Sequence, residues 1–135
     1  MKRTFAEKIL GAAKGSIVFC KPAIVLSHDN SASIYNTFLK MGGKNVFNPD
    51  QLLIVLDHNA PPTDAKLAND YQSIRDFVKA QKIKKFYDAG MGICHQLISN
   101  HARPGMIILG SDSHTCTAGA FNTLAAGIDR TETAG

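Results

Sequence analysis

The sequence predicts an α/β fold with a mainly parallel sheet and helices on both faces. Short apolar runs alternate with segments of helical periodicity, which is the pattern of strands joined by crossover helices. Two runs, 52–56 (LLIVL) and 106–109 (MIIL), are apolar at every residue, as is typical of parallel strands covered on both faces. No repeat or Pro/Gly/Ser-rich linker interrupts the 135 residues, so we expect a single α/β domain over 1–135.

The first half of the chain contributes two predicted strands and one helix between them. The run 24–26 (IVL) predicts the first strand. A helix follows, because Ile34, Phe38 and Met41 share one helical face, and Gly42-Gly43 is expected to end it. The second strand is the apolar run described above.

A second helix follows a Pro61-Pro62 turn. Thr63 or Asp64 can cap its first turn, because both side chains accept hydrogen bonds from free backbone amides. Its apolar positions recur at helical spacing and are Leu67, Tyr71, Ile74 and Val78.

The second half predicts two further strands. Residues 84–87 (KKFY) indicate a strand at the edge of the sheet, and 88–92 a glycine-rich turn into a short helix that ends at Leu97. The fourth strand is the run 106–109. We expect a final helix after it, with one apolar stripe formed by Phe121, Leu124, Ala125 and Ile128.

Composition excludes several classes of protein. Fifteen Lys and Arg against 11 Asp and Glu give a mild net charge of +4, a weak indication of anionic partners. No apolar run approaches the ~18 residues of a membrane-spanning helix. Glu7 and Lys8 interrupt the position of a signal peptide, and three cysteines without a CxxC motif fit a reducing compartment, so we expect a cytoplasmic protein.

Polar residues capable of catalysis follow each predicted strand. The segments concerned are Ser27-His28-Asp29, Asp57-His58, Asp88 with His95, and Asp112-Ser113-His114. Because the carboxyl ends of parallel strands share one edge, and ligands bind outside that edge, four of the five histidines are expected at one rim.

Asp57 and His58 place a carboxylate beside an imidazole. A carboxylate raises the pKa of a neighbouring histidine and makes it a usable general acid. The alternative is that Asp57 caps a turn and His58 is a solvated loop residue, because adjacent side chains on an extended chain point apart.

Asp112, Ser113 and His114 lie where a strand ends and a helix is expected to begin. Free amides at a helix start bind anions, so Ser113 and the amides after it could hold a substrate carboxylate. The alternative is simple capping by Ser113 or Thr115, and both interpretations can hold together. For His95 a packed, hydrogen-bonded core position is an equal alternative.

Structural roles are expected for the remaining polar residues. Asp29 and Asn30 are interpreted as helix caps and His101 as a surface residue. The three cysteines lie too far apart for a local zinc or iron–sulfur ligand set, and each is expected to be a small buried apolar residue. Their positions are Cys20, Cys94 and Cys116. The lysines at 79, 82, 84 and 85 are interpreted as solvated, with no nucleic-acid partner expected.

Several spaced segments resemble one known family. They occur in this order: Ala6-Glu7-Lys8-Ile9-Leu10, Ser27-His28-Asp29-Asn30, Val55-Leu56-Asp57-His58 with Pro61, Gly92-Ile93-Cys94-His95-Gln96, Pro104-Gly105 and Gly110-Ser111-Asp112-Ser113-His114-Thr115-Cys116-Thr117. Together they resemble the aconitase superfamily, and most of all the large subunits of isopropylmalate dehydratase and homoaconitase. The likeness runs from residue 4 to residue 135.

The resemblance implies an iron–sulfur hydro-lyase that isomerises a hydroxy di- or tricarboxylate by removing water and adding it back. It implies that Asp57 and His58 assist departure of the hydroxyl and that His95 and Asp112 form a second pair. It also implies that Ser113 contacts a substrate carboxylate and that His114 hydrogen-bonds an iron-bound water. The substrate stays open among isopropylmalate, homocitrate, citrate and dimethylmalate.

The resemblance also implies that residues 1–135 are the N-terminal part of a longer large subunit that works with a small, swivelling-domain subunit. Family members hold a 4Fe-4S cluster with three cysteines from a later domain, so we expect no cluster and no metal on this chain alone. Two alternatives of other classes stay open. One is a hydrolase with zinc on His58, His95, Asp112 and His114. The other is a non-catalytic module that binds anions or RNA.

Overall fold

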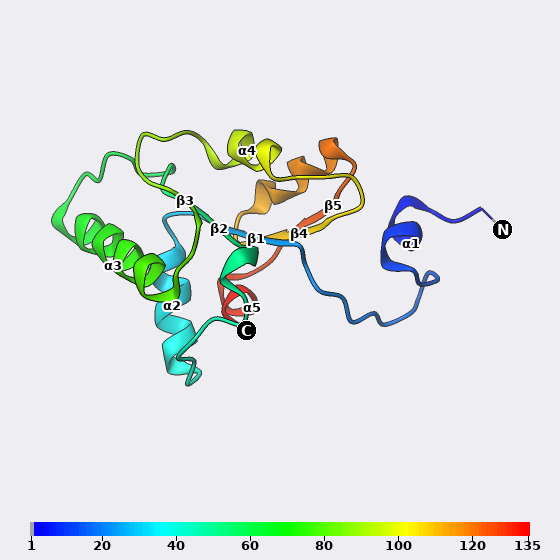
Figure 1. Cartoon of the computed structure of the whole chain (residues 1–135), viewed down its shortest axis with the longest axis horizontal. Coiled ribbons are helices and arrows are strands. Elements are labelled where there is room, and N and C mark those ends of the chain that lie inside the picture. The colour runs from blue at the N-terminus through cyan, green and yellow to red at the C-terminus, as the bar shows by residue number, and fades with distance from the viewer. Residues whose placement is uncertain (1) are drawn as a thin grey trace.

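A computed structural model describes residues 2–135 and contains a five-stranded, wholly parallel sheet (Figure 1). The strand order is β3-β2-β1-β4-β5, so the first strand lies in the middle. The strands are β1 (Ile24–Ser27), β2 (Leu52–Val55), β3 (Lys85–Tyr87), β4 (Ile107–Gly110) and β5 (Leu124–Gly127).

Helices cover both faces of this sheet, which confirms the predicted fold class. In Figure 1, the helix α4 (Cys94–Leu97) and the 3-10 helix η3 (Ser113–Phe121) lie above the sheet. The helices α2 (Ser31–Lys40) and α5 (Arg130–Ala134) lie below it. The α-helices are α1 (Phe5–Leu10), α2 (Ser31–Lys40), α3 (Ala65–Gln81), α4 (Cys94–Leu97) and α5 (Arg130–Ala134). The 3-10 helices are η1 (Pro49–Gln51), η2 (Ile98–Asn100) and η3 (Ser113–Phe121). Across residues 2–135, no helix has both the length and the apolarity needed to cross a membrane.

Two apolar cores form because neighbouring residues of a strand point to opposite faces. In β2, Leu53 and Val55 join the core under α4, η2 and η3, whereas Ile54 joins the core under α2 and α3. The second core is filled by α3, whose buried residues are Tyr71, Ile74, Phe77 and Val78. The sheet is therefore held on both faces, and its carboxyl edge has a fixed shape.

α3 and β3 form where the local sequence predicted them. Asp64 caps α3 by accepting a hydrogen bond from the Leu67 amide at 2.7 Å. β3 lies at one edge of the sheet with all its residues half-buried. The helix α2 ends one residue earlier than its apolar pattern suggested, because Met41 caps it and is 59% exposed. The expectation that Met41 lies within this helix was wrong.

The predicted final helix was also wrong. Residues 113–121 form a 3-10 helix, which ends at Asn122 with a left-handed φ of 59°. Residues 124–127 then pair with β4 as a fifth strand, one more than the sequence indicated. The ladder to β4 satisfies their backbone groups, and tertiary pairing overrides the helical spacing of the apolar residues.

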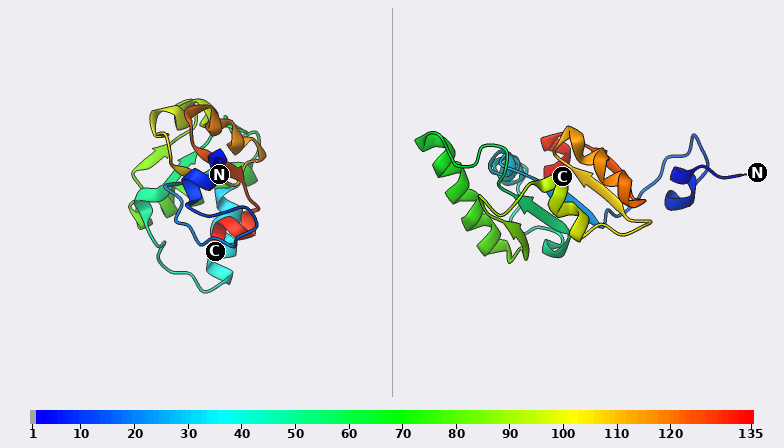
Figure 2. Two further views of the ribbon diagram at one scale, coloured as in Figure 1. Left: turned by 90° about the vertical axis from the view of Figure 1, so that its right-hand side faces the viewer. Right: turned by 90° about the horizontal axis from the view of Figure 1, so that it is seen from above.

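The N-terminal segment stands apart from the sheet. The helix α1 begins with a capping box between Thr4 and Glu7, and it buries none of its residues. Figure 1 and the right-hand view of Figure 2 show it separated from the strands by an extended stretch of chain. It contributes nothing to the site described next.

Candidate active site

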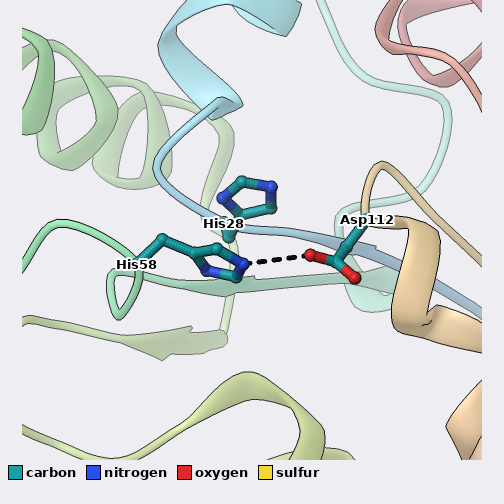
Figure 3. Close-up of side chains that lie close together, drawn as sticks. All are labelled: His28, His58 and Asp112. Atoms are coloured by element: carbon teal, nitrogen blue, oxygen red, sulfur yellow. Dashed lines mark hydrogen bonds and ion pairs between the residues drawn. The ribbon is translucent and has the colours of Figure 1, made fainter.

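The candidate site lies at the carboxyl ends of three adjacent strands, β2, β1 and β4. The loops that leave these strands carry His28, Asp57, His58 and Asp112, and the short helix α4 adds His95 from above. Figure 3 shows His58 between His28 and Asp112. The rule that parallel strands present their carboxyl ends together therefore predicted the place of the site.

His58 bridges two carboxylates. Its Nδ1 lies 2.7 Å from Oδ1 of Asp57, and its Nε2 lies 3.0 Å from Oδ2 of Asp112. Burial opposes the charged ring, but the two carboxylates outweigh it and raise the pKa of His58 above its ordinary value. The imidazolium form is favoured, as a general acid requires.

Asp57 is held in the ionised state by its surroundings. Its Oδ2 accepts a hydrogen bond from the Cys94 amide at 2.6 Å, while Oδ1 faces His58. Burial raises the pKa of Asp57, but the Cys94 amide and His58 together lower it below the ordinary value. The two side chains therefore contact each other rather than pointing apart, although His58 does lie in an exposed turn.

Asp112 is the centre of the cluster and is only 8% exposed. Its Oδ1 lies 3.4 Å from Nε2 of His95 and 3.3 Å from Nδ1 of His114, while Oδ2 faces His58. Burial raises the pKa of Asp112, but the His114 amide and His58 outweigh it and lower the pKa. One buried carboxylate thus faces three imidazoles.

Asp112 also caps η3, the role that the sequence suggested for Ser113 or Thr115. Its carboxylate accepts a hydrogen bond from the His114 amide. Thr115 instead donates its hydroxyl hydrogen to the carbonyl of Asp112 at 2.7 Å. Ser113 keeps an exposed hydroxyl, 3.4 Å from Nδ1 of His114. Ser113 is therefore free to contact a ligand.

His28 is the residue of the site to which the sequence gave no role. Its ring stacks on that of His58, with centroids 3.9 Å apart and 22° between the planes (Figure 3). Its Nδ1 is buried and has no hydrogen-bond partner in the part of the chain that the structure describes. Burial, and then the charge of His58, lower the pKa of His28. Its position just after β1 was the only signal in the sequence.

The capping role was wrong for Asp29, whereas Asn30 is the N-cap residue of α2 but makes no capping hydrogen bond with its side chain. Asn30 makes no side-chain bond to the start of α2; its amide group donates to the Ser111 carbonyl at 2.9 Å. The carboxylate of Asp29 accepts from the Asp57 amide at 3.1 Å and from the side-chain amide of Asn59 at 3.0 Å. The side chains of both residues therefore tie neighbouring loops of the rim together.

Asp88, which was expected at the rim, lies elsewhere, and so does His101, which was interpreted as a surface residue. Asp88 forms a two-pronged ion pair with Arg75 at 2.8 Å, and the guanidinium lowers the pKa of Asp88. His101 is half-buried rather than at the surface, and its Nε2 lies 2.7 Å from the hydroxyl of Tyr87. Neither residue contacts the cluster around Asp112.

The cysteines follow the expectation in one case of three. Cys94 is fully buried, but Cys20 and Cys116 are exposed. Burial, and then the charge of Asp57, raise the pKa of Cys94, so its thiol stays protonated. The expectation of a buried apolar role was wrong for the two exposed residues.

Among residues 2–135, three groups of side chains have donor atoms close enough for a metal ion. In the first, His28 and His58 have stacked rings, whose in-plane lone pairs cannot both point at one ion. The second contains the protonated thiol of Cys94. The third consists of His95, Asp112 and His114, with the two rings at 72° to each other. Only this last group has a geometry that suits a metal.

A cavity on the other side of the sheet does not contain the cluster. It has a volume of about 630 Å³ and lies on the α2 face of the sheet, where Ile34, Phe38, Phe47 and Phe77 contribute to its apolar wall. None of the six residues predicted for the site lines it. The candidate residues therefore lie at the carboxyl edge of the sheet and not in this cavity.

Comparison with known proteins gives the same family as the motifs. Residues 3–135 match the model of the aconitase family (aconitate hydratase). The 3-isopropylmalate dehydratase large subunit 1 of Methanopyrus kandleri is 38% identical over 99% of this chain and 34% of its own length. The methanogen homoaconitase large subunit of Methanocaldococcus jannaschii is 38% identical over 97% of this chain and 33% of its own length. The chain spans about a third of the length of these relatives, and it belongs to the aconitase family.

Proposed function

We propose that this chain forms one wall of the active site of a hydro-lyase that isomerises a hydroxy di- or tricarboxylate by dehydration and rehydration. The reaction favoured is that of a 3-isopropylmalate dehydratase large subunit, and the alternative is a homoaconitase or aconitase-type hydratase. The observation that carries this proposal is the position of His58 between the carboxylates of Asp57 and Asp112.

The chemistry of dehydration needs a proton donor, because hydroxide is a poor leaving group and departs more readily as water. His58 is the donor in this proposal, since both carboxylates stabilise its imidazolium form. The proton that leaves comes from Nε2, where the substrate hydroxyl takes the place of Asp112, and the hydrogen that remains on Nδ1 donates to Asp57 and keeps the neutral ring oriented for the reverse step. Rehydration then uses the same ring as a base.

The other rim residues bind and orient the substrate in this proposal. Asp112 and His95 form the second carboxylate–imidazole pair, and His114 presents a largely exposed ring beside them. The exposed hydroxyl of Ser113 donates to a substrate carboxylate. A substrate that carries two or three carboxylates suits a rim with several protonatable imidazoles.

Members of the aconitase family generally use a 4Fe-4S cluster. The described residues do not fit the thiolate set that such a cluster needs, because Cys94 is buried and protonated and the other two cysteines are exposed. We therefore place the cluster ligands outside this chain and derive no step through the cluster. The expectation that the isolated chain holds no cluster is part of the proposal.

The partners proposed are the rest of a large subunit and a small, swivelling-domain subunit. The relatives named "large subunit" support this, and the chain matches about a third of each. A single domain over 1–135, a cytoplasmic location, and no nucleic-acid or membrane partner belong to the same proposal. Three free cysteines are in keeping with a reducing compartment.

A zinc-dependent hydrolase is the second candidate, and the group His95, Asp112 and His114 favours it. Three protein ligands with an open fourth position are typical of catalytic zinc. A calorimetric zinc titration tests it. Tight binding that is lost in His114→Ala and kept in His101→Ala would favour the hydrolase, and weak or absent binding would exclude it.

The hydro-lyase is tested in a chimera in which this chain replaces the matching third of the Methanopyrus kandleri large subunit. The chimera is assembled with the small subunit and supplied with isopropylmalate, homocitrate or citrate. Turnover of one of these acids supports the proposal and identifies the substrate class. A chimera that folds and holds its cluster, yet dehydrates none of them, would contradict it.

A further inference from the structure

Asp29 is a buried carboxylate that none of the roles above uses. It is 7% exposed and lies two residues after the end of β1. One oxygen accepts from the Asp57 amide at 3.1 Å. The other accepts from both the backbone amide and the side-chain amide of Asn59. A single carboxylate therefore holds the residues on either side of His58.

The loop that carries His58 has no regular structure of its own. β2 ends at Val55, and residues 56–59 belong to no helix or strand. Within residues 2–135 the amide of His58 donates to no protein acceptor, whereas both flanking amides donate to Asp29. The direction of the His58 side chain, and hence its reach to Asp112, depends on these bonds.

The charge of Asp29 is balanced by amide groups rather than by a cation. Within residues 2–135, no Lys, Arg or His nitrogen lies within salt-bridge distance of it. Behind it lies Tyr71, which is fully buried. Burial raises the pKa of Tyr71, and the negative charge of Asp29 raises it further. A buried carboxylate is tolerated only when such donors satisfy it.

We propose that Asp29 is the positioning residue for His58, because its carboxylate fixes the 57–59 loop so that the ring meets both Asp57 and Asp112. The inference rests on the proposed function for the role of His58 as proton donor. The contacts that Asp29 makes can be tested without turnover. Asp29 touches neither substrate nor reacting atoms in this account. It acts through the backbone on both sides of the ring.

Amide hydrogen exchange of the wild-type chain, followed by NMR, is the first test. The amides of Asp57 and Asn59 are expected to be protected although they lie in a loop, and the amide of His58 between them serves as the internal control. Protection of the two flanking amides at least tenfold above that of His58 supports the proposal. Equal, fast exchange of all three would overturn it.

Two variants of Asp29 separate the effect of its position on the pKa of His58 from the effect of its charge. In Asp29→Asn, the new amide group faces the Asn59 donors and cannot accept from them. Asp29→Glu keeps the charge but moves the carboxylate by one methylene. In both, His58 loses part of its contact with the two carboxylates, and its pKa falls by about 1 unit. Asp76→Asn, an exposed change of the same charge, is the control.

The pKa of His58 could instead fall in Asp29→Asn and stay unchanged in Asp29→Glu. That result would mean that the charge of Asp29 acts on His58 through space, and it would overturn the proposal that Asp29 positions His58. If both variants fail to fold, the exchange experiment on the wild type decides. A chimera without turnover contradicts the hydro-lyase and leaves protection and titration unaffected, so the two failures are distinguishable.

Discussion

The imidazole of His58 meets the carboxylate of Asp112 across 54 positions of sequence, with Nε2 3.0 Å from Oδ2. Two loops from different strands are needed for this contact, and β1, which lies between β2 and β4, separates those strands. The ring is held from its other side by Asp57 at 2.7 Å. A histidine held between two ionised carboxylates is biased toward the protonated form that donates a proton.

The first prediction concerns the order in which the histidines titrate. We expect the pKa of His58 above 6.5, and those of His28 and His101 below it. Burial, and then the positive charges of Lys85 and Arg103, lower the pKa of His101, which lies away from the site. NMR titration of the imidazole protons measures all three. A pKa of His58 at or below that of His101 would refute the bridging arrangement.

The second prediction concerns how the free energy of unfolding depends on pH, which follows from the sign of each pKa shift. Because the pKa of His58 is raised on folding, its contribution is complete below the unfolded value near 6.5 and is lost as pH rises through the folded value. His28 has the opposite sign, since its pKa is lowered, and it costs stability as pH falls below 6.5. Urea unfolding of a variant with both His28→Asn and His101→Asn removes the two histidines of opposite sign, and its free energy of unfolding is expected to decrease above neutral pH.

The next prediction concerns the negative charge of Asp112. Asp112→Asn leaves three imidazoles facing a neutral amide and is expected to cost about 1–3 kcal/mol at pH 6. The cost should be smaller at pH 8, where His58 carries less charge. Asp76→Asn on the exposed side of α3 is the matched control, expected within about 0.5 kcal/mol of the wild type. Equal losses at both pH values would show that Asp112 acts only as a cap.

Gly127 gives a test of the backbone around the site. A Cβ at this position would lie 2.7 Å from the carbonyl oxygen of Asp112 and 3.1 Å from Cα of Ser113. Gly127→Ala must therefore push the 112–113 turn away from β5, at a cost of about 1–3 kcal/mol. Gly119→Ala, where a Cβ meets nothing within 4 Å, should be close to neutral. Urea denaturation of the pair measures the difference, and similar stabilities would contradict the close approach.

Reconstitution with iron and sulfide under anaerobic conditions tests where the cluster ligands lie. We expect no stoichiometric 4Fe-4S absorption from this chain, because Cys94 is buried and protonated and the other two thiols are exposed and separate. A complete relative such as the Methanopyrus kandleri large subunit is the positive control. One cluster per chain, lost in Cys94→Ser, would overturn the placement of the ligands outside these residues.

Periodicity and burial allowed the fold class to be predicted but not its last strand. The run 52–56 could be assigned because every residue is apolar, whereas Leu124, Ala125 and Ile128 also fit a helical stripe. Pairing with β4 decides between these structures, and that contact spans residues far apart in the sequence. The order of the strands is unreadable for the same reason.

The site was predictable where topology alone places a residue. Asp57, His58, His95 and Asp112 follow strands whose carboxyl ends meet, so their proximity could be expected. The role of Asp29 could not, because its partners are amides about 30 residues away and the local pattern resembles a helix cap. Stacking of His28 on His58 is likewise a contact between loops.

The most direct test of the central claim is turnover by the chimeric large subunit with His58 replaced. His58→Asn keeps a polar side chain that can donate a hydrogen bond but cannot transfer a proton. We expect kcat to fall by about 10²–10⁴-fold with KM changed little. His101→Asn, at a half-buried histidine outside the cluster, is expected to leave kcat unchanged. A His58→Asn enzyme with the kcat of its parent would contradict the assignment of this rim as the acid–base wall.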